Sequence, residues 1–315
     1  MNIVFMGTPE FAVPSLNALI AAGFKPSMVV TRPDLPRGRG QKVDITPVKA
    51  VSLAHNIPLL QPGSVKDPAF VSALSKMEID IMVVVAYRIL PEAVYSLARK
   101  GAFNLHGSLL PAFRGAAPIH RAVMAGVKET GVTTFFLKKE VDTGDVILRA
   151  STLVGANETA GDVYERLMYL GADLVVQTVR MIKQGPVPTL RQDDRLVSPA
   201  PKIFPDDCYV DWTKPAQVVH NFIRGLSPFP GARTMLDGKL LKLYRSEVVA
   251  DNHASYAPGT ILINTGKLLV ACGTGMISLI EVQLEGRKRL PASAFLAGKT
   301  DFVGSCLVPR PSKGA

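Results

Sequence analysis

Up to about residue 126 the chain alternates β-like hydrophobic runs with segments of helical periodicity. The β-like runs cover residues 3–6, 27–31, 57–60 and 79–86, and the helical segments cover residues 9–22, 47–55 and 68–77. Strands that alternate with helices indicate βαβ units and a parallel sheet. Residues 81–85 are apolar at every position, as in a strand covered on both faces, so we expect this strand in the middle of the sheet.

Residues 129–205 have a different texture. Two β-like runs, residues 132–137 and 146–149, flank a turn at residues 141–145, and a long helical segment follows at residues 160–184. The next stretch is rich in proline and has little periodicity, which is typical of an extended linker. The sequence therefore predicts a domain junction at residues 187–205.

After residue 206 the pattern predicts one short helix, residues 215–224, and then a series of short strands. Glycine-containing turns at residues 237–238, 264–266 and 273–275 separate these strands. Short strands at this spacing are typical of a small antiparallel barrel.

Length and composition agree with two folded domains. The chain has 315 residues, of which 47% are hydrophobic, enough to fill two cores. The longest apolar stretch, residues 81–87, is too short to cross a bilayer, and residues 1–7 read as a strand and not as a secretory leader. We therefore expect a cytoplasmic protein with no membrane association.

Charge points to an acidic partner. Lys and Arg number 36 against 26 Asp and Glu, for a net charge of +10, and nucleic acid is the commonest large acidic partner. The three cysteines, Cys208, Cys272 and Cys306, lie far apart. This spacing matches no zinc or redox pair, so no metal site is expected.

The first strand ends in Gly7-Thr8-Pro9-Glu10. This segment has neither the Gly-x-Gly-x-x-Gly pattern of dinucleotide-binding folds nor the lysine of a phosphate-binding loop. A dehydrogenase and a P-loop nucleotidase are therefore disfavoured.

Asn104 and His106 carry the strongest catalytic signal. They lie two apart at the end of a predicted strand, so both side chains project from the same face. An amide beside an imidazole can stabilise the oxyanion of a tetrahedral intermediate, and Asp142 could orient His106 or accept a proton. The alternatives are a packed strand histidine and, with less support, a nucleophilic triad of Ser108, His106 and Asp142.

Three segments stand out as motifs: NLHGSLLP at residues 104–111, RGAAPI at 114–119 and DTGD at 142–145. Together they closely resemble motifs of the methionyl-tRNA formyltransferase family. Further matches are GTP at 7–9, RPD at 32–34, GRG at 38–40, TPVK at 46–49, VVAY at 84–87 and IRGLSPFPGA at 223–232. The resemblance spans almost the whole chain, and its specificity comes from the combination.

The resemblance implies an α/β protein in which a Rossmann-like formyltransferase domain with a mostly parallel sheet (residues 1–186) is followed by a linker (187–205) and an OB-like antiparallel β-barrel that binds tRNA (206–315). It implies transfer of a formyl group from 10-formyltetrahydrofolate to the α-amine of initiator methionyl-tRNA in translation initiation, without metal. The amine attacks directly, through a tetrahedral intermediate. The implied catalytic residues are Asn104, His106 and Asp142, and the implied folate contacts are Ser108, Leu109, Leu110, Pro111 and Tyr87.

The resemblance also implies how tRNA is held. Residues 32–49 form a basic loop that would enter the acceptor end, which nominates Arg37, Arg39 and Lys42. In the barrel, phosphate contacts are expected from Lys239, Lys242, Arg245, Arg287, Lys288 and Arg289.

One departure from the family pattern is Tyr87-Arg88-Ile89-Leu90-Pro91, where a loop one residue shorter carries Arg88. The simplest interpretation is an arginine that points to solvent. A glycinamide ribonucleotide is disfavoured as the acceptor, because formyltransferases of that class resemble only the first domain, whereas a nucleotide-linked amino sugar stays open. The presence of Asn104, His106 and Asp142 together speaks against a non-catalytic RNA-binding protein on the same scaffold.

Overall fold

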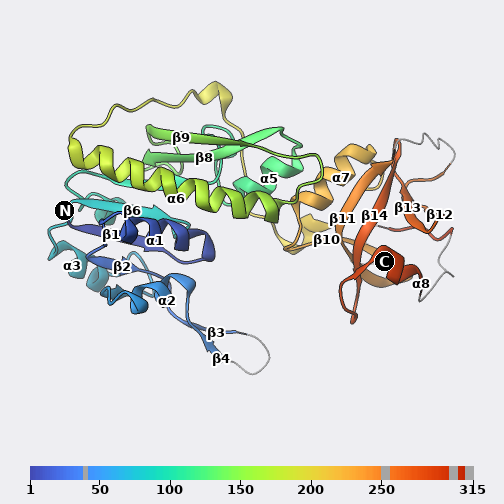
Figure 1. Cartoon of the computed structure of the whole chain (residues 1–315), viewed down its shortest axis with the longest axis horizontal. Coiled ribbons are helices and arrows are strands. Elements are labelled where there is room, and N and C mark those ends of the chain that lie inside the picture. Colours follow the sequence, from blue (N-terminus) through green and yellow to red (C-terminus); the bar gives the residue numbers. More distant parts are fainter. Residues whose placement is uncertain (38–41, 250–255, 298–303, 309–315) are drawn as a thin grey trace. The chain divides into compact units, whose positions relative to one another are not determined.

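The computed structural model describes residues 1–37, 42–249, 256–297 and 304–308 (Figure 1). Its residues group into two compact units. The first comprises Met1–Pro118, Thr130–Thr152 and Tyr164–Ala200, and the second Ile119–Glu129, Leu153–Val163 and Pro201–Ala315. The division into residues 1–186, 187–205 and 206–315 remains our proposal for the domain boundaries along the sequence.

The first unit is built on a seven-stranded sheet with the order β5-β2-β1-β6-β7-β8-β9. The strands are β1 (Ile3–Gly7), β2 (Met28–Val30), β5 (Leu59–Leu60), β6 (Ile81–Val85), β7 (Ala102–His106), β8 (Glu129–Phe136) and β9 (Val146–Leu153). Strands β5, β2, β1, β6 and β7 pair in parallel, and β8 pairs antiparallel with β7. The predicted mostly parallel sheet is confirmed, with the fully buried β6 in its centre.

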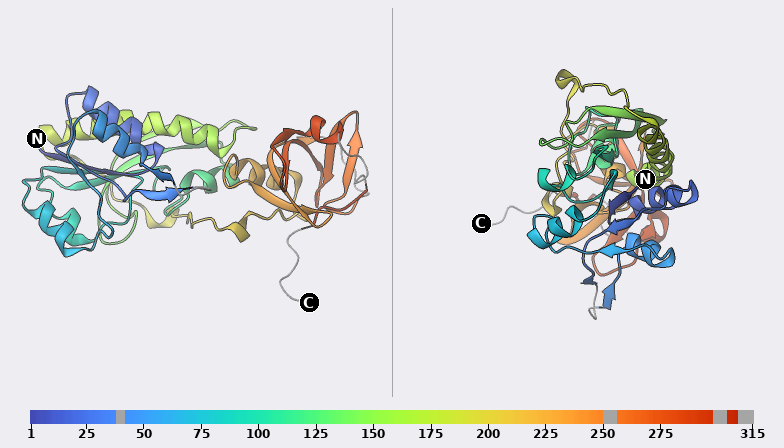
Figure 2. Two further views of the ribbon diagram at one scale, coloured as in Figure 1. Left: turned by 90° about the horizontal axis from the view of Figure 1, so that it is seen from below. Right: turned by 90° about the vertical axis from the view of Figure 1, so that its left-hand side faces the viewer.

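Helices cover both faces of this sheet (Figure 2). They are α1 (Val13–Ala21), α2 (Pro47–Ala54), α3 (Pro68–Ser75), α4 (Glu92–Tyr95) and α6 (Ala160–Gln184). On one face Phe70 and Leu74 of α3 pack into a core with Met82 and Val84 of β6. Helix α6 packs over β7 and β8, where Thr178 and Thr134 share a hydrogen bond of 2.8 Å between their hydroxyl oxygens.

Helix α2 begins where the sequence predicts. The Thr46 side chain accepts a hydrogen bond from the Lys49 backbone N–H, and Pro47 is the first helical residue. This cap satisfies one of the free N–H groups at the helix start.

The second unit contains an antiparallel sheet with the order β10-β11-β14-β13-β12, and β15 pairs with β14. Its elements are α5 (Pro118–Met124), α7 (Ala216–Gly225), β10 (Ala232–Leu236), β11 (Lys239–Val249), β12 (Ile261–Asn264), β13 (Lys267–Ala271), β14 (Met276–Leu284), β15 (Leu290–Pro291) and α8 (Ala292–Ala297). Turns of 3-10 helix occur at Glu10–Ala12, Asp194–Leu196 and Pro205–Cys208. The predicted antiparallel sheet and its three glycine turns are confirmed.

Two buried histidines make the stability of the second unit depend on pH. His220 donates from Nε2 to the Ala156 carbonyl (2.9 Å), and its Nδ1 lies 3.0 Å from the Ser246 hydroxyl. His120 donates from Nδ1 to the Gly225 carbonyl (2.8 Å). Burial lowers the pKa of both imidazoles below the ordinary value. The unfolded chain therefore binds protons more readily than the folded protein does.

We predict that the free energy of unfolding is greatest above pH about 6.5, the ordinary histidine pKa, and falls as the pH drops below it. Each proton taken up on unfolding contributes a slope of about 1.4 kcal/mol per pH unit. Urea unfolding at two pH values on either side of this pKa measures the drop. His220→Gln should reduce the drop and the exposed control His55→Gln should not; an equal drop in all three proteins contradicts the prediction.

Among the described residues, no helix is long and apolar enough to cross a membrane. Within the same ranges, no group of three or more His, Cys, Asp or Glu side chains is arranged to hold a metal ion.

Candidate active site at the carboxyl end of the first sheet

The candidate site lies where the parallel strands β6 and β7 end. Asn104 and His106 both belong to β7, and Asn104 pairs in register with Val84 of β6. The carboxyl ends of parallel strands meet at one edge of a sheet, which is the usual ligand-binding edge of this fold class. The loop after β6, with Tyr87, therefore starts at the same edge as the Asn104 and His106 pair.

Asn104 is half-buried, and its amide has no hydrogen-bond partner among the residues that the structure describes. Its N–H groups are therefore available to a ligand.

His106 is buried and held by two neighbours. Its Nε2 lies 2.9 Å from the Phe113 carbonyl oxygen. Because a carbonyl oxygen only accepts, Nε2 carries a proton. The other ring nitrogen, Nδ1, faces the Asp142 carboxylate, with Nδ1 and Oδ2 3.8 Å apart. The strand and the distant turn thus bring together two of the predicted catalytic side chains.

Asp142 sits in a strained turn. Its φ of 57° is in the left-handed region, which is uncommon for a residue with a side chain. The carboxylate accepts a hydrogen bond from the Gly115 backbone N–H (3.0 Å), and only 12% of the side chain is exposed. The neighbouring loop therefore fixes the carboxylate on the side of His106.

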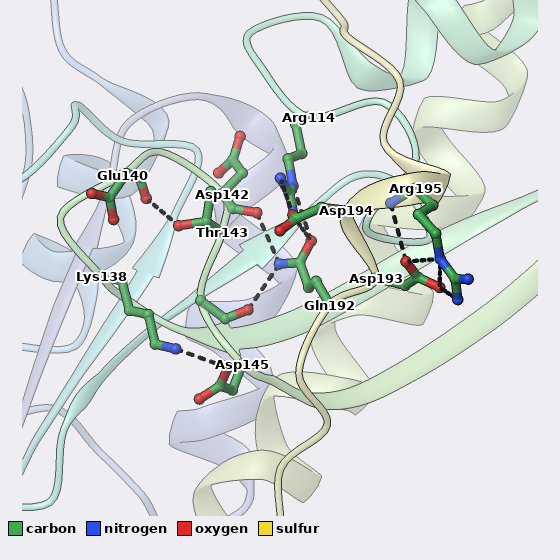
Figure 3. A network of polar contacts seen from close by, with 11 residues as sticks. Arg114, Lys138, Glu140, Asp142, Thr143, Asp145, Gln192, Asp193, Asp194 and Arg195 are labelled. Atoms are coloured by element: carbon green, nitrogen blue, oxygen red, sulfur yellow. Dashed lines mark hydrogen bonds and ion pairs between the residues drawn. The ribbon is translucent and has the colours of Figure 1, made fainter.

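Sequence analysis did not identify Gln192, which supports this turn. Gln192 donates to the backbone oxygens of Asp142 and Gly144, and Arg114 donates to Gln192 (Figure 3). Gln192 belongs to the segment that the periodicity assigns to a linker. No pattern in residues 191–195 distinguishes Gln192 from its polar neighbours, so only the structure identifies it.

Ser108 is not arranged as a nucleophile. Its hydroxyl is fully buried and donates to the Ala112 carbonyl oxygen (2.6 Å). The proton is therefore not directed at His106, and the geometry disfavours the triad of Ser108, His106 and Asp142.

The segment after His106 is held mainly through its backbone. The Thr133 hydroxyl donates to the Ser108 carbonyl oxygen (2.7 Å) and accepts from the Leu110 N–H (3.1 Å). Ser108, Leu110 and Pro111 are buried, and Leu109 is half-buried. Of these four side chains, Leu109 is the most accessible to a ligand.

The loop after β6 differs from its expected form at Arg88. The guanidinium is half-buried and is not held by solvent alone; it donates to the backbone oxygens of Gly63 (2.7 Å) and Pro62 (3.2 Å). Residues 62 and 63 closely follow β5, so the sheet places both carbonyl oxygens as acceptors for this guanidinium. The adjacent Tyr87 hydroxyl is buried without a hydrogen-bond partner among the described residues, and burial raises its pKa.

The basic segment after β2 contains a short hairpin of β3 (Leu35–Arg37) and β4 (Lys42–Asp44), in which Arg37 pairs in register with Lys42. Arg39 lies outside the described residues. Lys49 is not a free charge: it pairs with Asp34 and donates to the Gln61 amide oxygen (3.0 Å).

The basic side chains of the second unit divide into two sets. Arg289 is tied to Glu281 (2.5 Å) and lies 4.1 Å over the Tyr244 ring, and Arg245 pairs with Asp162 (3.7 Å). Lys239, Arg287 and Lys288 are exposed, and Lys242 is half-buried. Since Arg289 covers the ring of the buried Tyr244, this tyrosine is not available for base stacking.

Gly144 lies so close to the backbone of Phe136, the last residue of β8, that a side chain does not fit. A Cβ built on this glycine would overlap the Phe136 carbonyl oxygen. We predict that Gly144→Ala lowers the free energy of unfolding by roughly 3 kcal/mol. The added Cβ forces the backbone of either residue 144 or Phe136 to move. Urea unfolding measures the loss. Gly63→Ala is the matched control, since a Cβ there meets no atom within 4 Å; equal stability of the two variants would contradict the prediction.

Comparisons with known proteins agree over nearly the whole chain. Residues 1–179 match the family model described as formyl transferase, and residues 202–300 match formyl transferase, C-terminal domain. A methionyl-tRNA formyltransferase of Chlorobium luteolum is 48% identical over 303 residues, which cover 95% of this chain and 96% of that protein. A methionyl-tRNA formyltransferase of Bacteroides fragilis is 44% identical over 309 residues, covering 95% of each chain.

Solved structures share the fold at lower sequence identity. An N-formyltransferase of Helicobacter canadensis, in complex with folinic acid and dTDP-3-aminofucose, matches with a TM-score of 0.69 and 17% identity over 89% of this chain and 99% of that one. HypX of Aquifex aeolicus, in complex with tetrahydrofolic acid, matches with a TM-score of 0.64 and 16% identity over 94% of this chain and 47% of that one.

Proposed function

This chain belongs to the methionyl-tRNA formyltransferase family, and we propose that Asn104, His106 and Asp142 are its catalytic residues. The enzyme transfers a formyl group to the α-amino group of methionine esterified to initiator tRNA. The observation that carries the site assignment is the approach of Asp142 to His106 at the end of β7, beside an amide with free donors.

The reaction needs no nucleophile from the protein, because the incoming amine attacks the formyl carbon itself. A new C–N bond forms and the formyl oxygen gains negative charge, which the Asn104 amide stabilises together with the adjacent His106 imidazole. Asp142 accepts the proton that the amine loses. When the bond from the formyl carbon to the folate nitrogen breaks, that nitrogen takes up a proton and tetrahydrofolate leaves.

The formyl donor is 10-formyltetrahydrofolate, and no metal takes part. Two features of this chain support a folate site beside β7. The first is the backbone of residues 108–111 with the half-buried Leu109; the second is the buried Tyr87 hydroxyl, which needs a polar partner. The Ser108 hydroxyl and the Leu110 backbone N–H support this site by fixing the backbone that the folate meets.

Initiator methionyl-tRNA is the partner, held by Arg37, Arg39 and Lys42 near its acceptor end and by the basic face of the second unit. The pairing of Lys49 with Asp34 and Gln61 anchors the start of helix α2 beside the segment that carries these three residues. Basic side chains in such a segment bind RNA by neutralising phosphates. As a translation enzyme, the protein works in the cytoplasm.

Single-turnover transfer of labelled formyl from 10-formyltetrahydrofolate tests the function. Purified initiator methionyl-tRNA should be labelled rapidly, and elongator methionyl-tRNA, the control acceptor, slowly. A nucleotide-linked amino sugar belongs in the same experiment. Labelling of the sugar and not of the tRNA would overturn the assignment of the acceptor and leave formyl transfer in place.

A further inference from the structure

The segment of residues 190–200 contacts the loops on which the candidate catalytic residues depend. At its start, Leu190 pairs with Val146 through two backbone hydrogen bonds of 2.8 and 2.9 Å, at the first residue of β9. Residues 193–199 are exposed or half-buried, whereas Gln192 is 5% exposed. An extended segment buries an amide of this size only where the amide has partners.

Gln192 uses every hydrogen-bonding position of its side chain (Figure 3). Its Nε2 donates to the backbone oxygens of Asp142 (2.9 Å) and Gly144 (2.8 Å). Its Oε1 accepts from Nη2 (2.7 Å) and Nε (3.0 Å) of Arg114. Carbonyl oxygens only accept and a guanidinium only donates, so the orientation of the amide is fixed. Only a neutral amide satisfies both sides at once.

The same segment also holds the loop of residues 113–115. Ser198 accepts from the Phe113 N–H on its hydroxyl (2.9 Å) and from the Arg114 N–H on its backbone oxygen (2.9 Å). Ala200 donates to the Arg114 carbonyl oxygen (2.6 Å). That loop in turn contacts two of the three candidate catalytic side chains, since Phe113 accepts from His106 and Gly115 donates to Asp142.

We propose that Gln192 is a positioning residue for formyl transfer, which fixes the Asp142 turn at its distance from His106; this inference rests on the proposed function. The Asp142 turn needs such support from its neighbours. Asp142 has a left-handed backbone and no hydrogen bond from His106, so its place is set by the backbone that Gln192 and Gly115 hold. A displacement of about 1 Å in such a group can cost about 100-fold in rate.

Gln192→Glu is the sharpest test, because it keeps the shape and the acceptor for Arg114 but replaces the donor with an oxygen facing two carbonyl oxygens. We expect kcat for methionyl-tRNA formylation to fall about 30-fold, with the KM for tRNA and for 10-formyltetrahydrofolate within about threefold of the wild type. Asp193→Asn is the matched control in the same segment; among the described residues this side chain contacts Arg195 alone. Its kcat should stay within about twofold.

Making Gln192→Glu in the Asp142→Asn variant distinguishes a positioning role from a merely structural one. If Gln192 acts by placing the Asp142 carboxylate, Gln192→Glu should lower the residual rate of that variant by no more than about threefold. A full 30-fold loss in both backgrounds, or a rise in KM with kcat unchanged, overturns the proposal. Should Gln192→Glu fail to fold in thermal unfolding, the uncharged Gln192→Met replaces it with the same two outcomes.

Two variants distinguish the proposed catalytic site from the proposed role of Gln192. Wild-type activity of His106→Ala would overturn the proposed catalytic site. An inactive His106→Ala beside a fully active Gln192→Glu would overturn only the role of Gln192.

Discussion

Replacing His106 with alanine is expected to lower the rate of formyl transfer by about 1,000-fold, within the range measured for lost oxyanion donors and proton-transfer groups. The ring is buried, its Nε2 is fixed by Phe113 and its Nδ1 faces Asp142, so no described neighbour replaces it. Asp142→Asn should give a loss of similar size, because an amide in place of the carboxylate accepts no proton from the amine.

The measurement is single-turnover labelling of initiator methionyl-tRNA at saturating concentrations of both substrates. Glu140→Gln is the control, because it makes the same change from acid to amide at an exposed position of the same loop; its rate should stay within about twofold of the wild type. Binding of tRNA should be near normal in all variants. Substantial residual turnover in both His106→Ala and Asp142→Asn would contradict the assigned roles.

The same experiment distinguishes an enzyme from a protein that only binds RNA. A non-catalytic RNA-binding protein on the same scaffold would keep its function in His106→Ala. The burial of His106 against Phe135, with the ring centroids 6.5 Å apart, is compatible with a packed histidine. The free amide of Asn104 and the approach of Asp142 are not explained by packing alone.

Affinity for methionyl-tRNA is expected to fall by about 1,000-fold or more between about 50 and 200 mM salt, if six or more phosphates are neutralised. The net charge of +10 and the exposed Lys239, Arg287 and Lys288 supply the cations. Each lost phosphate contact should reduce the slope of log affinity against log salt by about 0.9. A filter-binding or fluorescence titration across this range measures the slope, and a flat dependence would contradict the prediction.

The two sets of basic residues allow a matched comparison. Alanine at Lys239, Arg287 and Lys288 together should lower the salt slope by up to about 3. Arg289→Ala should change the slope less than any one of these, because Glu281 and the Tyr244 ring already hold its guanidinium. An equal change in slope for Arg289→Ala and Arg287→Ala would contradict the prediction. It would show that pairing with Glu281 does not keep the Arg289 guanidinium from binding a phosphate.

Several features of this protein follow from local sequence alone. The apolar run of β6 determined a strand covered on both faces, and the spacing of Asn104 and His106 determined that both lie on one side of β7. Thr46 with Pro47 determined the start of α2, and the glycine turns determined the limits of the short strands in the second unit. These features depend on side-chain periodicity, capping and turn chemistry, which act between residues close together in the chain.

Tertiary structure alone decided which distant residues meet. His106 and Asp142 approach because β8 and its turn return beside β7, and Gln192 reaches Asp142 across 50 residues of sequence. The Ser108 hydroxyl donates to the Ala112 carbonyl and not to His106, and the half-buried Arg88 donates to the carbonyl oxygens of residues 62 and 63. Such contacts depend on strand order and on competition among buried polar groups for partners, and neither is encoded in the spacing of neighbouring residues.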